Sequence, residues 1–136
     1  MRVAFGTDLA TSTTDAVRAW LAEHGHQLVA VVPDGSPWPD VGQAVAEAVA
    51  GGEADVGVVC CWTGTGVSMA ANKVAGVRAA LCTDAETARG ARRWNDANVL
   101  ALGLRLTSPT VAGELLEAFL GTPAEAEEAQ NYRRLT

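Results

Sequence analysis

The segment Val56–Lys73, VGVVCCWTGTGVSMAANK, decides the fold class of this chain. Its first part, Val56–Cys60, is an unbroken apolar run, which is typical of a strand buried on both faces of a parallel sheet. The run meets a turn rich in threonine and glycine, and a helical pattern then continues to about Val74. The segment therefore predicts a strand, a tight turn and a helix, with the thiol of Cys61 at the mouth of the turn.

The same alternation of strand and helix runs along the whole chain. The predicted strands are 3–7, 27–32, 56–60, 77–82 and 99–102. Segments of helical period lie between them, and their ends carry ordinary signals, such as the N-cap residue Asp84 and the terminating Gly25. Strands that alternate with helices imply right-handed crossovers and a parallel sheet covered on both faces. We therefore expect a Rossmann-like three-layer α/β/α sandwich with a five-stranded parallel sheet.

The length of 136 residues allows one domain with a substantial core and little room for a second, so we expect a single domain over 1–136. The stretch 33–40 contains three prolines and is predicted as a loop, with the next helix beginning at Asp40. The pattern of a capping box at Thr122–Glu125 predicts a charged C-terminal helix over about 123–136.

Composition excludes several classes of function. The net charge of −6 and a pI of about 4.8 argue against general nucleic-acid binding, which relies on a basic face. No apolar run approaches the roughly 20 residues that span a bilayer. The N-terminus lacks the long apolar stretch of a signal peptide. We therefore expect a cytoplasmic protein with no nucleic-acid or membrane partner.

The three cysteines, Cys60, Cys61 and Cys82, are an odd number at a spacing that fits neither a disulfide framework nor a zinc site. We expect no metal. Cys60 and Cys82 lie in predicted strands, where a free cysteine is usually a small buried apolar residue. Cys61 differs because it stands where a strand ends.

The turn after Cys61 fails the tests for three known phosphate-binding loops. The dinucleotide fingerprint lacks its third glycine, because Met69 occupies that place. No Gly-Lys-Ser/Thr follows, as a P-loop requires. A cysteine phosphatase loop would need an arginine where Val67 stands.

Two interpretations of the turn remain open. In the first, the N–H groups of the turn bind an anion, and the helix dipole favours the thiolate of Cys61. A thiolate beside such a pocket can remove a proton next to a carbonyl while the N–H groups hold the enediolate oxygen. In the second, Cys61 is inert, and Gly64 and Gly66 merely permit close packing.

Longer stretches of the chain carry a family resemblance. They are an N-terminal G-x-D ending at Asp8, GEADVGVVCCWTGTG over 52–66, AANKVAGVRAALC over 70–82 and NDANVLALGLR over 95–105. With these motifs the chain resembles the ribose-5-phosphate isomerase B and galactose-6-phosphate isomerase family of aldose–ketose isomerases over nearly its whole length. The resemblance implies active sites between the subunits of a homodimer or tetramer, a sugar or sugar-phosphate substrate, and no metal or organic cofactor.

The resemblance also implies roles for individual residues. Cys61 matches the proton-transferring base, Thr63 a hydroxyl that contacts the reacting oxygens, and Asp8 a carboxylate that binds sugar hydroxyls. Asn95 matches an asparagine that helps to hold the intermediate. The residues matched to substrate binding are Gly64, Thr65, Gly66, Val67 and Ser68 in the enediolate-stabilising turn and Arg105 and Arg134 at the phosphate. For each residue the alternative is ordinary capping or surface charge.

The chain departs from the family pattern at several of these places. Trp94 replaces the histidine that the resemblance would assign to ring opening, and Leu9 replaces a histidine near the phosphate. Trp62 takes the place of a glycine after the cysteine, and Trp38 that of a tyrosine. Of the basic C-terminal pattern only the last arginine, Arg134, remains. An indole cannot exchange protons near neutral pH, so the change at Trp94 is not conservative.

We therefore predict an aldose–ketose isomerase that uses Cys61 and an enediol intermediate on a substrate other than ribose 5-phosphate, with Trp62 and Trp94 reshaping the pocket. One alternative is a non-catalytic member that binds a sugar-like ligand or acts as a partner subunit, with the tryptophans filling core or interface space. A redox role for Cys60 and Cys61 is weaker, because neighbouring strand residues point to opposite faces.

Overall fold

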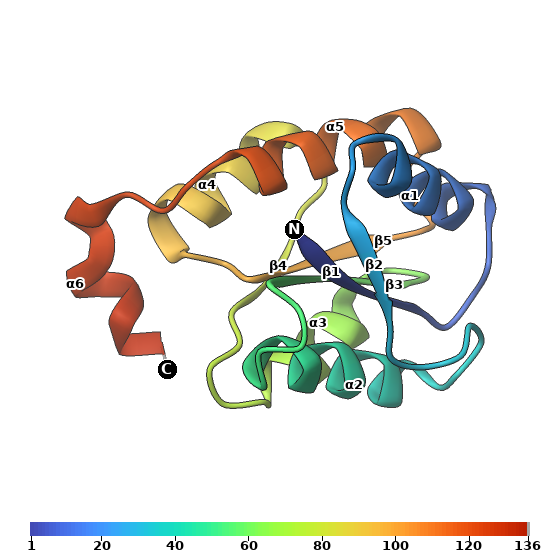
Figure 1. Ribbon diagram of the computed structural model, residues 1–136, viewed down its shortest axis with the longest axis horizontal. Coiled ribbons are helices and arrows are strands. Elements are labelled where there is room, and N and C mark those ends of the chain that lie inside the picture. Colours follow the sequence, from blue (N-terminus) through green and yellow to red (C-terminus); the bar gives the residue numbers. More distant parts are fainter. Residues whose placement is uncertain (136) are drawn as a thin grey trace.

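The computed structural model describes residues 1–135 and contains a five-stranded parallel sheet between two layers of helices (Figure 1). The strands are β1 (Arg2–Thr7), β2 (Gln27–Ala30), β3 (Val56–Cys61), β4 (Ala79–Leu81) and β5 (Val99–Gly103). Their order in the sheet is β2-β1-β3-β5-β4, and every pair is parallel. The predicted five-stranded parallel sheet is confirmed.

Helices cover both faces of the sheet, as predicted. On one face lie α1 (Ser12–Glu23), α4 (Ala85–Asn95) and α5 (Pro109–Gly121), and on the other lie α2 (Trp38–Ala50) and α3 (Thr65–Asn72) (Figure 1). Buried apolar residues form a separate core on each side of the sheet, with Phe119 and Leu21 in one and Val41 and Val45 in the other. None of the helices within residues 1–135 is long and apolar enough to cross a membrane.

The central strand β3 is buried along its whole length, which explains its unbroken apolar sequence. It pairs with β1 on one side and with β5 on the other. The chain leaves β1 toward α1 on one face and leaves β3 toward α3 on the opposite face. Ligands of open parallel sheets bind where neighbouring connections diverge in this way, beyond the carboxyl ends of the strands.

Three local predictions differ from the structure. The helix expected from Asp40 begins at Trp38, because Pro39 lies in the first turn, where a missing N–H is tolerated. The strand expected over 27–32 ends at Ala30. The strand expected over 77–82 is limited to Ala79–Leu81.

The helix predicted over about 123–136 begins later, at Ala126, and is divided into three short segments. The chain instead forms η1 (Ala126–Glu128), α6 (Ala129–Tyr132) and η2 (Arg133–Leu135), and Thr136 lies outside the described residues. Hydrogen bonds from Arg92 Nε to the Thr122 carbonyl and from the Glu125 N–H to the Arg93 carbonyl tie the preceding segment to α4. These tertiary contacts compete with a capping box at Thr122, which is extended and ends α5.

The turn between β3 and α3 is held tightly against the end of β5. The N–H of Leu104 donates to the carbonyl of Cys61 at 2.9 Å, and the N–H of Arg105 donates to that of Trp62 at 2.8 Å. Gly64 has a φ of +77°, and a Cβ added there would lie 2.8 Å from the Gly103 nitrogen and 2.5 Å from Leu81 Cδ1. Glycine is therefore required at this position by both backbone conformation and space.

Replacing Gly64 with alanine is expected to lower the free energy of unfolding by about 2–4 kcal/mol, since left-handed strain and overpacking add. Gly25→Ala is the matched control, because Gly25 has a φ of +76° with nothing within 4 Å of the added Cβ. Its cost is expected to be about 1–2 kcal/mol from strain alone. If chemical denaturation gave the same loss of unfolding free energy for both variants, the contact of Gly64 with β5 would not contribute to stability as expected.

Candidate active site

A pocket of about 310 Å³ lies beyond the carboxyl ends of β1 and β3, where the two connections diverge. Asp8 follows β1 directly, and Cys61 is the last residue of β3. The lining residues are Asp8, Trp38, Cys61, Trp62, Thr63, Thr65 and Gly66. The fold thus brings together six of the residues predicted from the sequence, and it adds Trp38.

Cys61 is the one thiol of the three that lines this pocket. Only 5% of the residue is exposed, and its side chain belongs to the core on the α2 and α3 side of the sheet. Cys60 lies in the opposite core, where burial raises the pKa of its thiol far above the ordinary value. The adjacent cysteines are both free and face opposite sides of the sheet, which removes the basis for a redox pair.

Cys82 lies outside this pocket, at the end of β4. Burial raises the pKa of its thiol to about 11, with a smaller contribution from the nearby carboxylate of Asp84. A buried thiol with a raised pKa is a poor nucleophile or base near neutral pH. Cys60 and Cys82 therefore behave as the small buried apolar residues that the sequence predicted.

The carboxylate of Asp8 is the second ionisable group of the pocket. Its Oδ1 atom is buried and has no hydrogen-bond partner among residues 1–135. Burial raises the pKa of Asp8, and a hydrogen bond from its own backbone N–H opposes that shift. A buried carboxylate oxygen without a donor is costly, so the site is suited to a ligand hydroxyl that donates to Oδ1.

The turn supplies further polar groups to the pocket. The hydroxyls of Thr63 and Thr65 are hydrogen-bonded to each other at 2.7 Å, and both residues line the pocket. Gly64 is the N-cap of α3, so no side chain caps the first turn of that helix. Uncapped N–H groups at a helix start carry partial positive charge and favour an anionic ligand. Gly64 does pack closely against the end of β5, and this packing is compatible with anion binding by the turn.

Two tryptophans form exposed apolar walls of the pocket. Trp62 is 54% exposed and Trp38 is 45% exposed. The Trp38 ring lies against Gly66, where an added Cβ would approach ring carbons to 2.8 Å. Trp38 was not among the predicted site residues. The proximity of 38 to 66 depends on the packing of α2 on α3.

The remaining predicted residues lie outside this pocket of a single chain. Val67 is buried in the core and Ser68 is half-buried on α3. Arg105 and Arg134 are exposed. Trp94 and Asn95 line a separate pocket of about 520 Å³ beside β4 and α4, where the Trp94 ring lies against Gly90. Trp94 therefore does not reshape the Cys61 pocket within one chain.

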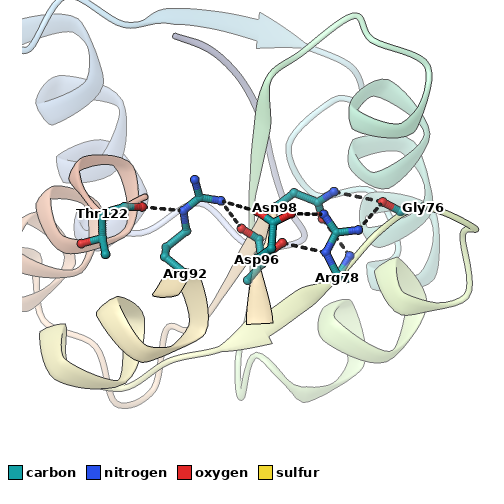
Figure 2. Close-up of polar contacts among 7 residues, drawn as sticks. Gly76, Arg78, Arg92, Asp96, Asn98 and Thr122 are labelled. Carbon is teal, nitrogen blue, oxygen red and sulfur yellow. Dashed lines mark hydrogen bonds and ion pairs between the residues drawn. The ribbon is translucent and has the colours of Figure 1, made fainter. Parts of the chain in front are cut away.

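A polar network fixes the chain immediately after Asn95 (Figure 2). Asp96 ends α4 with a φ of +48°. Arg78 donates from Nε to the Asp96 carbonyl at 2.7 Å and from Nη2 to Oδ2 at 3.2 Å. The guanidinium group of Arg92 lies 3.8 Å from Oδ1 and also donates to the carbonyls of Ala97 and Thr122. Both arginine side chains are about 15% exposed, so the network is well shielded from water.

Asn98 extends the network to the segment that precedes β4. The backbone N–H of Arg78 donates to Asn98 Oδ1 at 2.7 Å, and Asn98 Nδ2 donates to the Gly76 carbonyl at 3.0 Å (Figure 2). The segment 95–98, N-D-A-N, is thus held by polar contacts with Arg92 of α4 and with the residues that precede β4. Asn95 and Trp94 are presented on a rigid helix end. Within the described residues, no group of three or more histidine, cysteine, aspartate or glutamate side chains could hold a metal ion.

Comparison with known proteins identifies the family. The family model described as Ribose/Galactose Isomerase matches residues 3–136. Ribose-5-phosphate isomerase B of Escherichia coli is 38% identical over 137 aligned residues, which cover 95% of this chain and 89% of that protein. A D-erythrulose-4-phosphate isomerase of Pectobacterium atrosepticum is 42% identical over 88 residues, covering 65% of this chain and 58% of the relative.

Comparison with solved structures agrees with this family assignment. The solved structure of the type B ribose 5-phosphate isomerase of Trypanosoma brucei is 40% identical, with a TM-score of 0.90, and the match covers 98% of this chain and 95% of that one. This similarity extends over the sheet, both helix layers and the pocket region. The chain belongs to the ribose/galactose isomerase family of sugar-phosphate isomerases.

Proposed function

We propose that this protein is an aldose–ketose isomerase that acts on a sugar phosphate or a related sugar through an enediolate intermediate, with Cys61 as the base. One observation carries the proposal: the Cys61 thiol and the carboxylate of Asp8, whose Oδ1 atom is buried and unpartnered, line the same pocket beside the uncapped start of α3. The relatives act on sugar phosphates of different length by name, so family membership alone leaves the substrate open.

Cys61 as thiolate takes the proton from the carbon next to the carbonyl of an open-chain aldose. The electron pair of that C–H bond forms the carbon–carbon double bond of the enediolate, and the carbonyl oxygen becomes the oxyanion. N–H groups of the turn at Gly64–Gly66 and the Thr63 hydroxyl are suited to hold this oxygen. The thiol then returns the proton to the neighbouring carbon, which completes the exchange of carbonyl and hydroxyl positions.

Asp8 binds the oxygens of the substrate and transfers a proton between them. Its unpartnered Oδ1 accepts a hydrogen bond from a substrate hydroxyl, which orients the sugar in the pocket. The burial that raises its pKa also makes the carboxyl a better proton acceptor than an ordinary aspartate. It can therefore carry a proton between the two reacting oxygens while Cys61 moves the proton between the carbons.

A second copy of the chain would supply the phosphate-binding groups. Asn95, Arg105 and Arg134 lie outside the single-chain pocket, and the resemblance assigns such sites to the interface of a homodimer or tetramer. Trp62, Trp94 and Leu135 are large apolar side chains that are exposed on one chain. A cytoplasmic homo-oligomer is part of the proposal.

Cys61→Ala is expected to abolish exchange of the C2 proton with D₂O in ribose 5-phosphate, allose 6-phosphate, galactose 6-phosphate and their unphosphorylated sugars. The expected loss is about 10²–10⁴-fold, the usual contribution of a positioned base. Exchange is followed by proton NMR. Cys82→Ala is the matched control, because it removes a buried thiol outside the pocket and should retain exchange.

Two results would contradict the proposal. Exchange that survives in Cys61→Ala would assign the base to another group. Absence of exchange with every sugar from folded wild-type protein would favour a non-catalytic member that binds a sugar-like ligand or serves as a partner subunit. The tryptophan at 94, in place of the family's histidine, is the observation that favours this second candidate.

Asp8→Asn is expected to raise the melting temperature near pH 7 while lowering activity. The pKa of Asp8 is raised, so the native chain holds this proton to higher pH than the unfolded chain does. Stability from this group is therefore lost as pH rises above the ordinary carboxyl pKa of 3.8, and the ionised carboxylate is a cost at neutral pH. The advantage of the variant should shrink as pH falls toward that value.

Asp84→Asn is the control, because the opposite effect on stability at neutral pH is expected for it. A hydrogen bond from the Thr87 N–H lowers the pKa of Asp84, so its carboxylate stabilises the folded chain at neutral pH and ceases to do so in acid. Thermal melts between pH 3 and pH 8 compare the two variants. An Asp8→Asn protein that is no more stable than wild type at neutral pH would show that the carboxylate is already satisfied.

A further inference from the structure

The guanidinium group of Arg92 joins the end of α4 to the C-terminal segment, residues 122–135 (Figure 2). Its Nε donates to the Thr122 carbonyl at 3.0 Å, and its Nη1 donates to the Ala97 carbonyl. The same Nη1 lies 3.8 Å from Oδ1 of Asp96. One side chain of α4 therefore contacts both the chain that follows α4 and the chain that follows α5.

The C-terminal segment is held in place through α4. Among residues 1–135, η1 and α6 pack mainly on α4 (Figure 1). A second hydrogen bond beside that of Arg92 runs from the Glu125 N–H to the Arg93 carbonyl at 2.9 Å. The position of the whole segment therefore depends on how its first residues are attached to this helix.

The segment ends beside Asn95. Leu135 and Asn95 line the same pocket of about 430 Å³, and Arg134, which directly precedes Leu135, is exposed. Asn95 and Arg134 are two of the residues that the proposed function assigns to a substrate bound between two copies of the chain. They lie on the two parts of the chain that Arg92 joins.

Stability alone does not account for an arginine at position 92. The Asp96 carboxylate already has an ionic partner, because Nη2 of Arg78 donates to Oδ2 at 3.2 Å. Two guanidinium groups against one carboxylate leave one surplus positive charge, and only 14% of the Arg92 side chain is exposed. Burial lowers the pKa of Arg92, and Arg78 lowers it further, while Asp96 opposes the shift. A buried surplus charge is costly, which indicates that the arginine serves another purpose.

The geometry of the contacts requires arginine. The carbonyls of Ala97 and Thr122 belong to different segments, and a planar guanidinium presents donors to both in fixed directions. A lysine ammonium is a single point charge on a flexible stem. A methionine could pack on the Phe119 ring, over which the guanidinium lies at 5.3 Å, but it would donate to neither carbonyl.

We propose that Arg92 is a positioning residue for substrate binding, which joins the end of α4 to the C-terminal segment and so holds Asn95 and Arg134 where the phosphate of the substrate binds. The inference rests on the proposed function. Arg92 touches no reacting atom and acts through Arg134. Its loss therefore weakens binding of a phosphorylated substrate and leaves proton transfer by Cys61 in place.

A double-mutant cycle tests this role with Arg92→Met, Arg134→Met and the double variant. Exchange of the C2 proton of ribose 5-phosphate and of galactose 6-phosphate in D₂O gives kcat and KM for each protein. Arg92→Met is expected to raise KM about tenfold and to change kcat less than about threefold, because binding is lost and the chemical step is not. The double variant should have the KM of Arg134→Met, because one residue acts through the other.

Two further variants separate positioning from charge and from general destabilisation. Arg92→Lys keeps the positive charge and should still raise KM, because an ammonium does not reproduce the two-way contact; it also replaces Arg92→Met in the cycle if that variant does not fold. Arg89→Met is the matched control on the same helix. The Arg89 side chain is 40% exposed and pairs with Glu86 at 3.1 Å, so its loss should leave KM unchanged. Thermal melts establish that each protein is folded at the assay temperature.

Three results would overturn the positioning role and leave the isomerase function intact. They are a KM of Arg92→Met or Arg92→Lys equal to that of wild type, a loss confined to kcat, and effects on KM that multiply in the double variant. No exchange of either sugar phosphate by folded wild-type protein would overturn the proposed function and the inference with it.

Discussion

The close approach of the turn at Thr63–Gly64 to the end of β5 is the contact on which the rest of the site depends. A Cβ on Gly103 would lie 2.6 Å from the Thr63 carbonyl oxygen, and a Cβ on Gly64 would lie 2.8 Å from the Gly103 nitrogen. Backbone meets backbone here, which no larger residue permits. The contact fixes the end of β3 and the start of α3. It therefore fixes the position of the Cys61 thiol.

The order of the strands supplies the second half of the site. Because the connections after β1 and β3 leave toward opposite faces, the space beyond these two strands is not filled by either connection. Asp8 and Cys61 border that space. The Oδ1 atom of Asp8 is buried without a donor, which costs stability in the free protein and suits the binding of a hydroxyl. The same burial serves both the binding and the proton transfer proposed for this residue.

Sequence patterns predicted much of this arrangement, because the strands of a doubly wound sheet are short, apolar and separated by helices of clear period. Cys61 was a candidate because it stands where a predicted strand ends, and the family resemblance added Asp8. Trp38 was missed because its contact with Gly66 joins two helices that are distant in the sequence. The C-terminal segment was predicted as one helix, since local capping signals do not reveal the hydrogen bond from Arg92 to Thr122 or the one from Glu125 to the Arg93 carbonyl. The placement of Trp94 in a different pocket from Cys61 likewise depends on the tertiary path of α4.

A crystal structure with a four-carbon phosphorylated hydroxamic acid would test the central claim most directly, because the planar hydroxamate mimics the enediolate. The account predicts that the hydroxamate oxygens lie within hydrogen-bonding distance of the turn N–H groups at Gly64–Gly66 and of Asp8 Oδ1. It also predicts that the Cys61 sulfur lies against the carbon that would lose its proton. Binding in the pocket beside Trp94 and Cys82, with the space between Asp8 and Cys61 unoccupied, would contradict the account.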